Sequence, residues 1–382
     1  MINYGKQSID SSDINAVVDT LKSDWLTQGP KVTEFEKALA EYCGSKYAIA
    51  VCNGTAALHL ANLAIGTDTR TNVITTPISF LATSNSVIYS GGHPIFADIS
   101  GGDFVIDPEK VKQLVEGDND FKGIIPVHLG GVICDMESLM NIADENSLWI
   151  IEDACHALGG KWVDNMGETH CVGDCSYSDM TIFSFHPVKQ ITTGEGGAIT
   201  TNNQVLYEKL LTLRNHGMTK NPDELIENHG AWYYEMHALG YNYRMTDIQA
   251  ALGIQQLKKN DEWVTRRREL VRNYDDAFKG IEDLTVQKHP DQNETYSYHL
   301  YIIQCEKRGE LYEFLRNNGV NTQIHYIPIH LQPFYKKKYG YNKGDYPVAE
   351  SYYRKALSLP LYPTLKDEEQ EKIVTLVKKF YA

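Results

Sequence analysis

Short apolar runs of strand type alternate with longer helical patterns from about residue 46 to residue 201, and this alternation constrains the fold more than any other feature. Apolar runs that are separated by helical patterns indicate a mainly parallel sheet with both faces covered. The sequence therefore predicts an α/β fold, whose ligands bind outside the carboxyl ends of the strands. The expected strands are YAIAVC (47–52), NVITT (72–76), PIFADI (94–99), GIIPVH (123–128), LWIIED (148–153), MTIFSF (180–185) and GAITT (197–201). The expected helices between them are 55–64, 77–90, 108–116 and 136–146.

The pattern changes beyond residue 255. We predict a large sheet domain over 1–255 and a smaller α+β domain over 256–382, with packing elsewhere as an open alternative for the N-terminal segment 1–13. The elements expected in the smaller domain are a charged helix at 257–278, strands at 297–305 and 320–326, and helices at 310–319 and 367–380.

The charge balance argues against some classes of partner. The chain has 36 Lys and Arg against 50 Asp and Glu, a net charge of −14, which disfavours nucleic acid and anionic membranes as partners. It has no long apolar stretch of membrane-spanning length, and its first residues show no signal-peptide pattern. We therefore expect a cytoplasmic protein with no membrane partner.

The cysteines predict neither a disulfide framework nor a metal site. There are 7 of them, an odd and scattered number with no CxxC pair, as in proteins of a reducing compartment. His170, Cys171 and Cys175 could be considered as zinc ligands, but no fourth ligand stands at a customary spacing. We expect no metal.

A first candidate site is the strand-to-helix turn VCNGTAA (51–57). The backbone N–H groups of Gly54, Thr55 and Ala56 are expected to point outward at a helix N-terminus, where they would bind an anion together with the Thr55 hydroxyl. The alternative is an ordinary helix cap without a ligand, because Asn, Gly and Thr are all good capping residues.

A second candidate is IIEDACH (150–156), where Asp153 ends an apolar strand and His156 follows three residues later.

A third candidate is FSFHPVKQITTGEGG (183–197), in which Ser184 and Lys189 follow another strand. A lysine that leaves a buried strand is costly to desolvate, so its amine is pushed toward the neutral form that Schiff-base chemistry requires. The TGEGG segment lacks the spacing of a dinucleotide or P-loop motif.

Together these are the parts that a pyridoxal phosphate enzyme needs: a phosphate-binding turn, a carboxylate for the pyridine nitrogen and a lysine for the aldehyde. Phe80, just after another strand, is available to cover the ring.

The sequence resembles the sugar aminotransferases of the DegT/DnrJ/EryC1 family over essentially its whole length. The motifs that carry the resemblance include NGTAALHLA (53–61), TTPISFLATSN (75–85), EDACHALGG (152–160), FSFHPVKQITTGEGG (183–197), YNYRMTDIQAALGIQQL (241–257) and IHYIPIH (324–330). This resemblance implies fold-type I architecture, like that of aspartate aminotransferase, and pyridoxal 5′-phosphate as cofactor.

The resemblance also implies roles for individual residues. Lys189 would be the Schiff-base lysine and Asp153 would pair with the pyridinium nitrogen, which makes these two the catalytic residues. Asn242 would reach the cofactor phosphate of a neighbouring subunit, which implies a homodimer with two shared sites. The implied cofactor-binding set is Gly54, Thr55, Ala56, Phe80, Asp153, His156, Ser184, Lys189 and Asn242. The implied substrate-binding set is Tyr4, Asp24, Trp25, Leu26, Thr27, Gln323, Ile324, His325 and Tyr326.

Relatives with histidine in place of the lysine are dehydratases, so the presence of Lys189 implies transamination. The sequence around Lys189 is most similar to that of the branch that aminates carbon 4 of UDP-linked 4-keto-6-deoxy-N-acetylhexosamines. Enzymes of this branch use glutamate as donor and make a precursor of pseudaminic acid. Enzymes of perosamine or aminoarabinose type remain alternatives, as does a non-catalytic regulator that binds the cofactor. The stretch between Asp153 and Ser184 is longer than is typical for the family.

Overall fold

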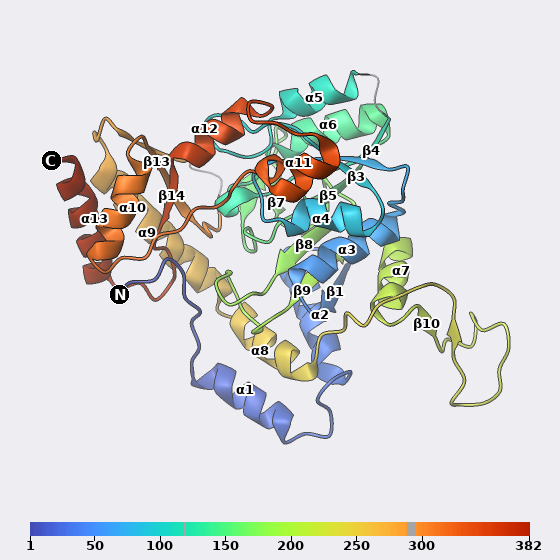
Figure 1. The fold of residues 1–382 in the computed structure, drawn as a ribbon. Helices are drawn as coiled ribbons and strands as arrows, with labels where there is room; N and C mark the ends of the chain where they lie inside the picture. The colour runs from blue at the N-terminus through green and yellow to red at the C-terminus, as the bar shows by residue number, and fades with distance from the viewer. Residues whose placement is uncertain (118–119, 289–294) are drawn as a thin grey trace.

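A seven-stranded sheet lies at the centre of the protein (Figure 1). The computed structural model describes residues 1–117, 120–288 and 295–382. The strand order is β1-β9-β8-β5-β4-β2-β3, in which β9 runs antiparallel to both of its neighbours and the other pairs are parallel. The predicted, mainly parallel sheet is therefore confirmed. Its strands are β1 (Tyr47–Val51), β2 (Asn72–Thr75), β3 (His93–Phe96), β4 (Phe121–Ile125), β5 (Trp149–Asp153), β8 (Met180–Ser184) and β9 (Gly197–Thr201).

Helices cover both faces of this sheet, because successive strand residues point to opposite sides. In β1, Ile49 and Val51 pack into one buried cluster with α3 and α7, whereas Ala48 and Ala50 pack into another with α2. The helices around the sheet are α2 (Pro30–Cys43), α3 (Gly54–Ile65), α4 (Ala82–Tyr89), α5 (Pro108–Val115), α6 (Met136–Asn146), α7 (Gln204–Arg214) and α8 (Asp247–Leu257). Helix α1 (Ser11–Leu21) packs on α8 at the edge of the molecule.

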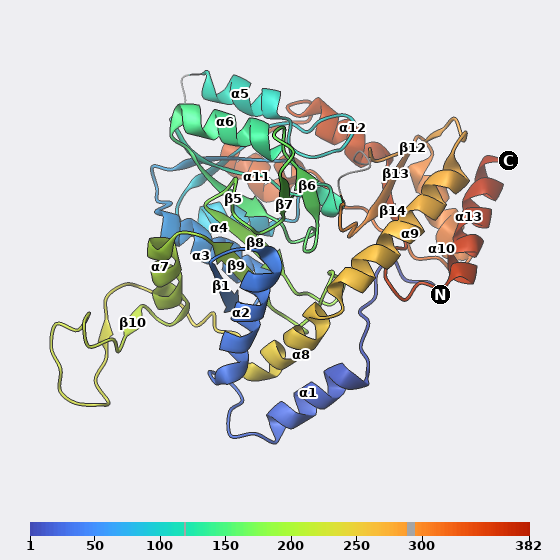
Figure 2. The same ribbon diagram turned by 180° about the vertical axis from the view of Figure 1, so that it is seen from behind.

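The C-terminal part of the chain builds a second, three-stranded antiparallel sheet beside the first (Figure 2). Its strands are β12 (Leu284–Val286), β13 (Tyr301–Cys305) and β14 (Ala356–Leu359). Helices α9 (Asn260–Phe278), α10 (Arg308–Asn317) and α13 (Asp367–Tyr381) pack around it. Among the described residues, no helix is both long enough and apolar enough to cross a membrane.

The N-terminal segment and two helices of the C-terminal part link the two halves of the structure. Ile2 forms a parallel bridge with Val320, so the N-terminal segment lies against the C-terminal part. In the other direction, α11 (Pro333–Tyr339) and α12 (Pro347–Lys355) reach back to the large sheet, where the hydroxyl of Tyr335 lies 2.8 Å from that of Ser84. The division at residue 255 therefore remains a prediction, with contacts crossing it in both directions.

Several predicted elements differ from the structure in kind or in extent. The predicted strand 320–326 makes only isolated bridges, because Val320 pairs with Ile2 and Gln323 with Ser358 on different neighbours. The charged helix expected over 257–278 is present as α9 but begins at Asn260, because residue 257 ends the preceding helix α8. The helix expected over 77–90 starts only at Ala82, which leaves the preceding residues as a loop at the end of β2.

Two hairpins have no counterpart in the predicted elements. One consists of β6 (Lys161–Val163) and β7 (Thr169–Cys171) and lies between β5 and β8 in the sequence. The other, which we call the arm, spans residues 217–241, contains β10 (Met218–Thr219) and β11 (Glu235–Met236), and projects away from the body (Figures 1 and 2).

Candidate active site

A cavity of about 670 Å³ opens at the carboxyl ends of β1, β5 and β8. Segments from the C-terminal part and the N-terminal segment close it from the other side. Twelve of the predicted site residues line it: Tyr4, Gly54, Thr55, Phe80, Asp153, His156, Ser184, Lys189, Gln323, Ile324, His325 and Tyr326. Six predicted residues lie outside the lining: Asp24, Trp25, Leu26, Thr27, Ala56 and Asn242.

The turn after β1 forms one end of the cavity. Asn53 caps α3, with its side-chain oxygen accepting a 2.8 Å hydrogen bond from the N–H of Ala56. This N–H is therefore not free for an anion, contrary to the expectation. Gly54 and Thr55 occupy the first two helical positions, whose N–H groups have no acceptor within the helix, and they remain available.

Ser184 lies directly opposite this turn, at the end of β8. A Cβ placed on Gly54 would come within 3.0 Å of the Ser184 Cβ and 3.3 Å of its Oγ. The close approach brings two hydroxyls, those of Thr55 and Ser184, to the N-terminus of one helix. This arrangement fits a phosphate group, because the helix dipole adds to the hydrogen-bond donors.

Asp153 is the last residue of β5 and is buried. Its Oδ2 accepts a 2.6 Å hydrogen bond from the hydroxyl of Thr83 on α4, and its Oδ1 accepts the backbone N–H of Cys155 at 3.2 Å. Because each carboxylate oxygen can accept more than one hydrogen bond, the side chain is oriented while keeping capacity for a donor in the cavity.

Lys189 follows β8 in a tight turn, in which its backbone N–H bonds to the carbonyl of His186 at 2.9 Å. Burial lowers the pKa of its amine, while Cys155 and Asp153 act in the opposite direction. Burial is the larger influence, so the amine is shifted toward its neutral, nucleophilic form. Phe80 lines the same cavity with 58% of its surface exposed, which leaves its ring free to cover a planar ligand.

His156 connects several walls of the cavity. Its Nδ1 accepts the backbone N–H of Gly130 at 3.2 Å, and its Nε2 lies 3.2 Å from the hydroxyl of Tyr326. The ring of His299 lies 4.4 Å from it, centroid to centroid. Burial lowers the pKa of both imidazoles well below the usual range. Both side chains are therefore neutral near pH 7.

Five of the six residues outside the lining lie on two exposed segments, whereas Ala56 is buried on α3. Trp25, with 59% of its surface exposed, belongs to the loop between α1 and α2, which also holds Asp24, Leu26 and Thr27. Asn242 is exposed just after the arm, where it forms an isolated backbone bridge with Asn215. The structure of one chain therefore does not bring these side chains to its own cavity.

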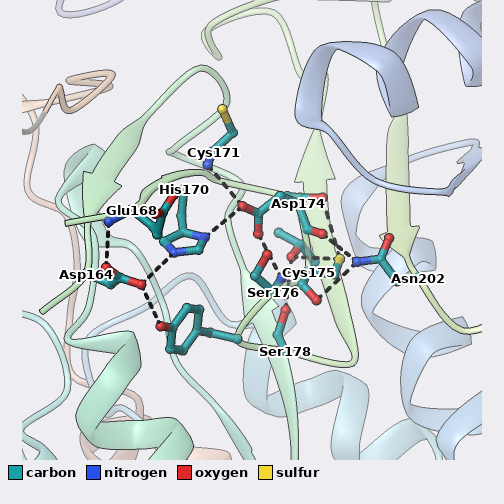
Figure 3. A network of polar contacts seen from close by, with 12 residues as sticks. Asp164, Glu168, His170, Cys171, Asp174, Cys175, Ser176, Ser178 and Asn202 are labelled. Atoms are coloured by element: carbon teal, nitrogen blue, oxygen red, sulfur yellow. Dashed lines mark hydrogen bonds and ion pairs between the residues drawn. The ribbon is translucent and has the colours of Figure 1, made fainter. Parts of the chain in front are cut away.

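The long stretch between Asp153 and Ser184 folds as the β6–β7 hairpin, and its polar residues bind each other. Figure 3 shows the imidazole of His170 between two carboxylates, with Nε2 3.1 Å from Asp164 and Nδ1 3.3 Å from Asp174. The sulfur of Cys171 points away from this imidazole, and Cys175 contacts threonine hydroxyls. Within the described ranges, no group of three or more His, Cys, Asp or Glu side chains is placed to hold a metal ion.

Sequence reasoning did not identify Thr83, Gly130 or His299 as parts of the site. Thr83 lies within TTPISFLATSN and Gly130 within the Gly-Gly pair at 130–131, so position after a strand was a usable signal for both. His299 comes from the C-terminal part of the chain, and no local pattern connects it to His156.

The comparisons with known proteins agree with this geometry. The profile of the DegT/DnrJ/EryC1/StrS aminotransferase family matches residues 7–378. The chain is 40% identical over 395 residues to UDP-4-amino-4,6-dideoxy-N-acetyl-beta-L-altrosamine transaminase of Campylobacter jejuni, with 100% of both chains covered.

Two solved structures are similar along nearly the whole chain. Helicobacter pylori PseC, an aminotransferase involved in the biosynthesis of pseudoaminic acid, has a TM-score of 0.90 at 33% identity and covers 100% of this chain and 99% of its own. The PLP-form of Spr1654 from Streptococcus pneumoniae has a TM-score of 0.90 at 30% identity, with 99% and 98% covered. The expected fold-type I architecture is confirmed, and the chain belongs to the DegT/DnrJ/EryC1/StrS aminotransferase family.

Proposed function

We propose that this protein is a pyridoxal 5′-phosphate-dependent aminotransferase that aminates carbon 4 of a UDP-linked 4-keto-6-deoxy-N-acetylhexosamine, with glutamate as amino donor. The proposal is carried by one observation. Lys189, Asp153 and the two facing residues Gly54 and Ser184 all line a single cavity. The substrate class rests on the names of the Campylobacter and Helicobacter relatives.

The residues of the cavity fit the cofactor in their chemistry. Thr55, Ser184 and the free N–H groups of the α3 N-terminus would hold its phosphate, and the Phe80 ring would lie on its pyridine ring. The cofactor supplies an aldehyde that accepts the amino group and a cationic ring that withdraws electrons from the reacting carbon.

The protein's own groups would manage the protons. The Asp153 carboxylate, oriented by Thr83, would keep a proton on the pyridine nitrogen. The Lys189 amine would take the proton from the α-carbon of glutamate and deliver it to the former aldehyde carbon of the cofactor, acting as general base and then general acid. In the second half of the reaction the same amine would move a proton in the reverse direction at carbon 4 of the sugar.

We propose a homodimer with shared sites. The arm exposes large apolar side chains, with Trp232 75% and Ile226 85% exposed, which is typical of surfaces that another chain covers. Asn242 follows this arm and faces outward, so a partner's cavity is a suitable place for its amide. The loop with Trp25 and Leu26 is similarly exposed and would contribute to the nucleotide-sugar site from the same dimer interface.

We assign the enzyme to the cytoplasm. All seven cysteines are free, as expected where thiols are kept reduced.

A substrate panel tests the function. Purified protein is incubated with glutamate and UDP-, GDP- or dTDP-linked 4-ketosugars, and oxoglutarate release is measured, with Lys189→Ala as control. Release with the UDP-linked N-acetylated sugar supports the proposal. Release only with a GDP-linked sugar or a UDP-4-ketopentose indicates an enzyme of perosamine or aminoarabinose type. Cofactor binding with no release from glutamate indicates a non-catalytic regulator.

A further inference from the structure

A chain of two hydrogen bonds leads from the backbone into the cavity. The N–H of Gly130 donates to Nδ1 of His156 at 3.2 Å, and Nε2 of the same ring lies 3.2 Å from the hydroxyl oxygen of Tyr326. The first bond has only one possible direction, because a backbone N–H cannot accept a hydrogen bond.

This direction determines where the proton of His156 resides. Since Nδ1 accepts a hydrogen bond, it carries no proton, and a neutral imidazole must then carry its proton on Nε2. The ring is neutral because burial lowers the pKa of His156 well below its usual range. Nε2–H therefore donates to the Tyr326 oxygen.

The backbone around His156 fixes this orientation. Gly130 has φ of 70°, a left-handed conformation that glycine adopts without strain. A Cβ on the next residue, Gly131, would come within 2.9 Å of the His156 carbonyl oxygen, so the turn packs directly on that residue. The hydroxyl of Ser297 donates to the same carbonyl at 3.1 Å, and the amide of Gln190 donates to it as well.

The aromatic ring of Tyr326 is held in place too. Its centroid lies 5.0 Å from that of His325 and 6.1 Å from that of Phe80. Because its oxygen already accepts from His156, the hydroxyl proton must point elsewhere, and Tyr326 lines the cavity. Burial raises the pKa of Tyr326 well above its usual value, so this proton stays on the oxygen.

We propose that Tyr326, aimed by His156, donates a hydrogen bond to an electron-rich oxygen of the molecule bound beside Lys189. The proposal rests on the proposed function. Two oxygens have this chemistry there: the keto oxygen of the sugar, which becomes more negative as the amine adds, and the phenolic oxygen attached to the pyridine ring of the cofactor. His156 is a positioning residue for this donor.

The variant Tyr326→Phe removes the donor and keeps the ring. Tyr177→Phe, in the segment between β7 and β8, is the matched control, because its hydroxyl donates to Asp164 outside the cavity. If the acceptor is the sugar oxygen, Tyr326→Phe loses about 100-fold in the rate of the ketosugar half-reaction and keeps the glutamate half-reaction. If it is the cofactor oxygen, the visible absorption of the bound cofactor shifts its pH midpoint, and both half-reactions slow.

Rates within twofold of the wild type and an unshifted midpoint would overturn the proposal. Such a result leaves the proposed function intact, because that function is tested by oxoglutarate release from the wild-type protein. The role of His156 is tested with the double variant His156→Asn/Tyr326→Phe. If His156 acts only by positioning Tyr326, the double variant should be no slower than Tyr326→Phe alone, whereas independent losses that multiply would contradict this role.

The position of the proton on the His156 ring can be measured directly, without turnover and without a variant of Tyr326. In the cofactor-free protein labelled with ¹⁵N-histidine, the His156 resonance, assigned by its loss in His156→Asn, is expected to show an unprotonated Nδ1 and a protonated Nε2. A proton on Nδ1 would overturn the assignment.

Discussion

The hydroxyl of Thr83 donates a 2.6 Å hydrogen bond to Oδ2 of Asp153, although the two residues lie 70 positions apart in the sequence. Thr83 belongs to α4 and Asp153 ends β5, so the bond joins a helix to the carboxyl end of a sheet strand. The Thr83 hydroxyl also lies 2.6 Å from that of Ser79. This pair of hydroxyls holds the carboxylate that the proposed mechanism directs at the pyridine nitrogen.

Thr83→Val is expected to lower kcat about tenfold while changing KM for glutamate little, because it loosens the carboxylate without removing it. Steady-state kinetics check this, with Thr212→Val as control, since the Thr212 hydroxyl bonds to the Glu208 carbonyl within α7. An equal fall in both variants would show that Thr83 has no specific role.

Asp153→Asn is expected to reduce turnover by several orders of magnitude. An amide cannot keep the pyridine nitrogen protonated, and an unprotonated ring is a poor electron acceptor. The measurement is kcat/KM for glutamate in the half-reaction. A loss below about tenfold, which corresponds to about 1.4 kcal/mol, would mean that Asp153 does not face the nitrogen.

Lys189→Ala is expected to abolish transamination and still bind free pyridoxal phosphate, since the phosphate turn is unchanged. Oxoglutarate release measures the first effect, and quenching of tryptophan fluorescence on titration with the cofactor measures the second. Normal turnover of this variant would refute the assignment of Lys189.

The cofactor-free protein should be more stable as Lys189→Met than as the wild type at pH 7. Burial lowers the folded-state pKa of Lys189, so the unfolded chain binds more protons between that pKa and the ordinary value of 10.5. The stability of the wild type therefore rises with pH through this window. The gap between the thermal midpoints of the two proteins should narrow toward pH 10, and a gap independent of pH would argue against a buried amine.

Mixed dimers test the shared site. Lys189→Ala and Asn242→Trp homodimers are each expected to be inactive or nearly so. If each site takes Lys189 from one chain and Asn242 from the other, a mixed dimer has one site with both changes and one with neither. After subunit exchange about half of the dimers are mixed, so about a quarter of the wild-type activity should return. No recovery despite verified exchange would place Asn242 outside the partner's site.

Local sequence determined the strands of the large sheet and the kinds of polar side chain that follow them. A buried strand in a parallel sheet reads as a short apolar run, and the alternation of such runs with helical patterns is visible without any knowledge of contacts. Asp153, Ser184 and Lys189 are polar residues at or after the ends of these runs, and they line the cavity. This agrees with the rule that ligands of parallel sheets bind outside the carboxyl ends of the strands. The specific roles and the reaction came from the resemblance of motifs.

Only the tertiary structure decided how distant segments meet. The pairing of β1 with β9, the closure of the cavity by Tyr4 and residues 323–327, and the bonds from Thr83 to Asp153 and from Gly130 to His156 all join residues far apart in sequence. The prediction of a strand over 320–326 was wrong for the same reason. An extended segment has the same local pattern whether it pairs along one neighbouring strand or touches two different neighbours, as this one does. Strand and helix patterns arise from interactions within a few residues, whereas register and side-chain partners depend on the packing of the whole chain.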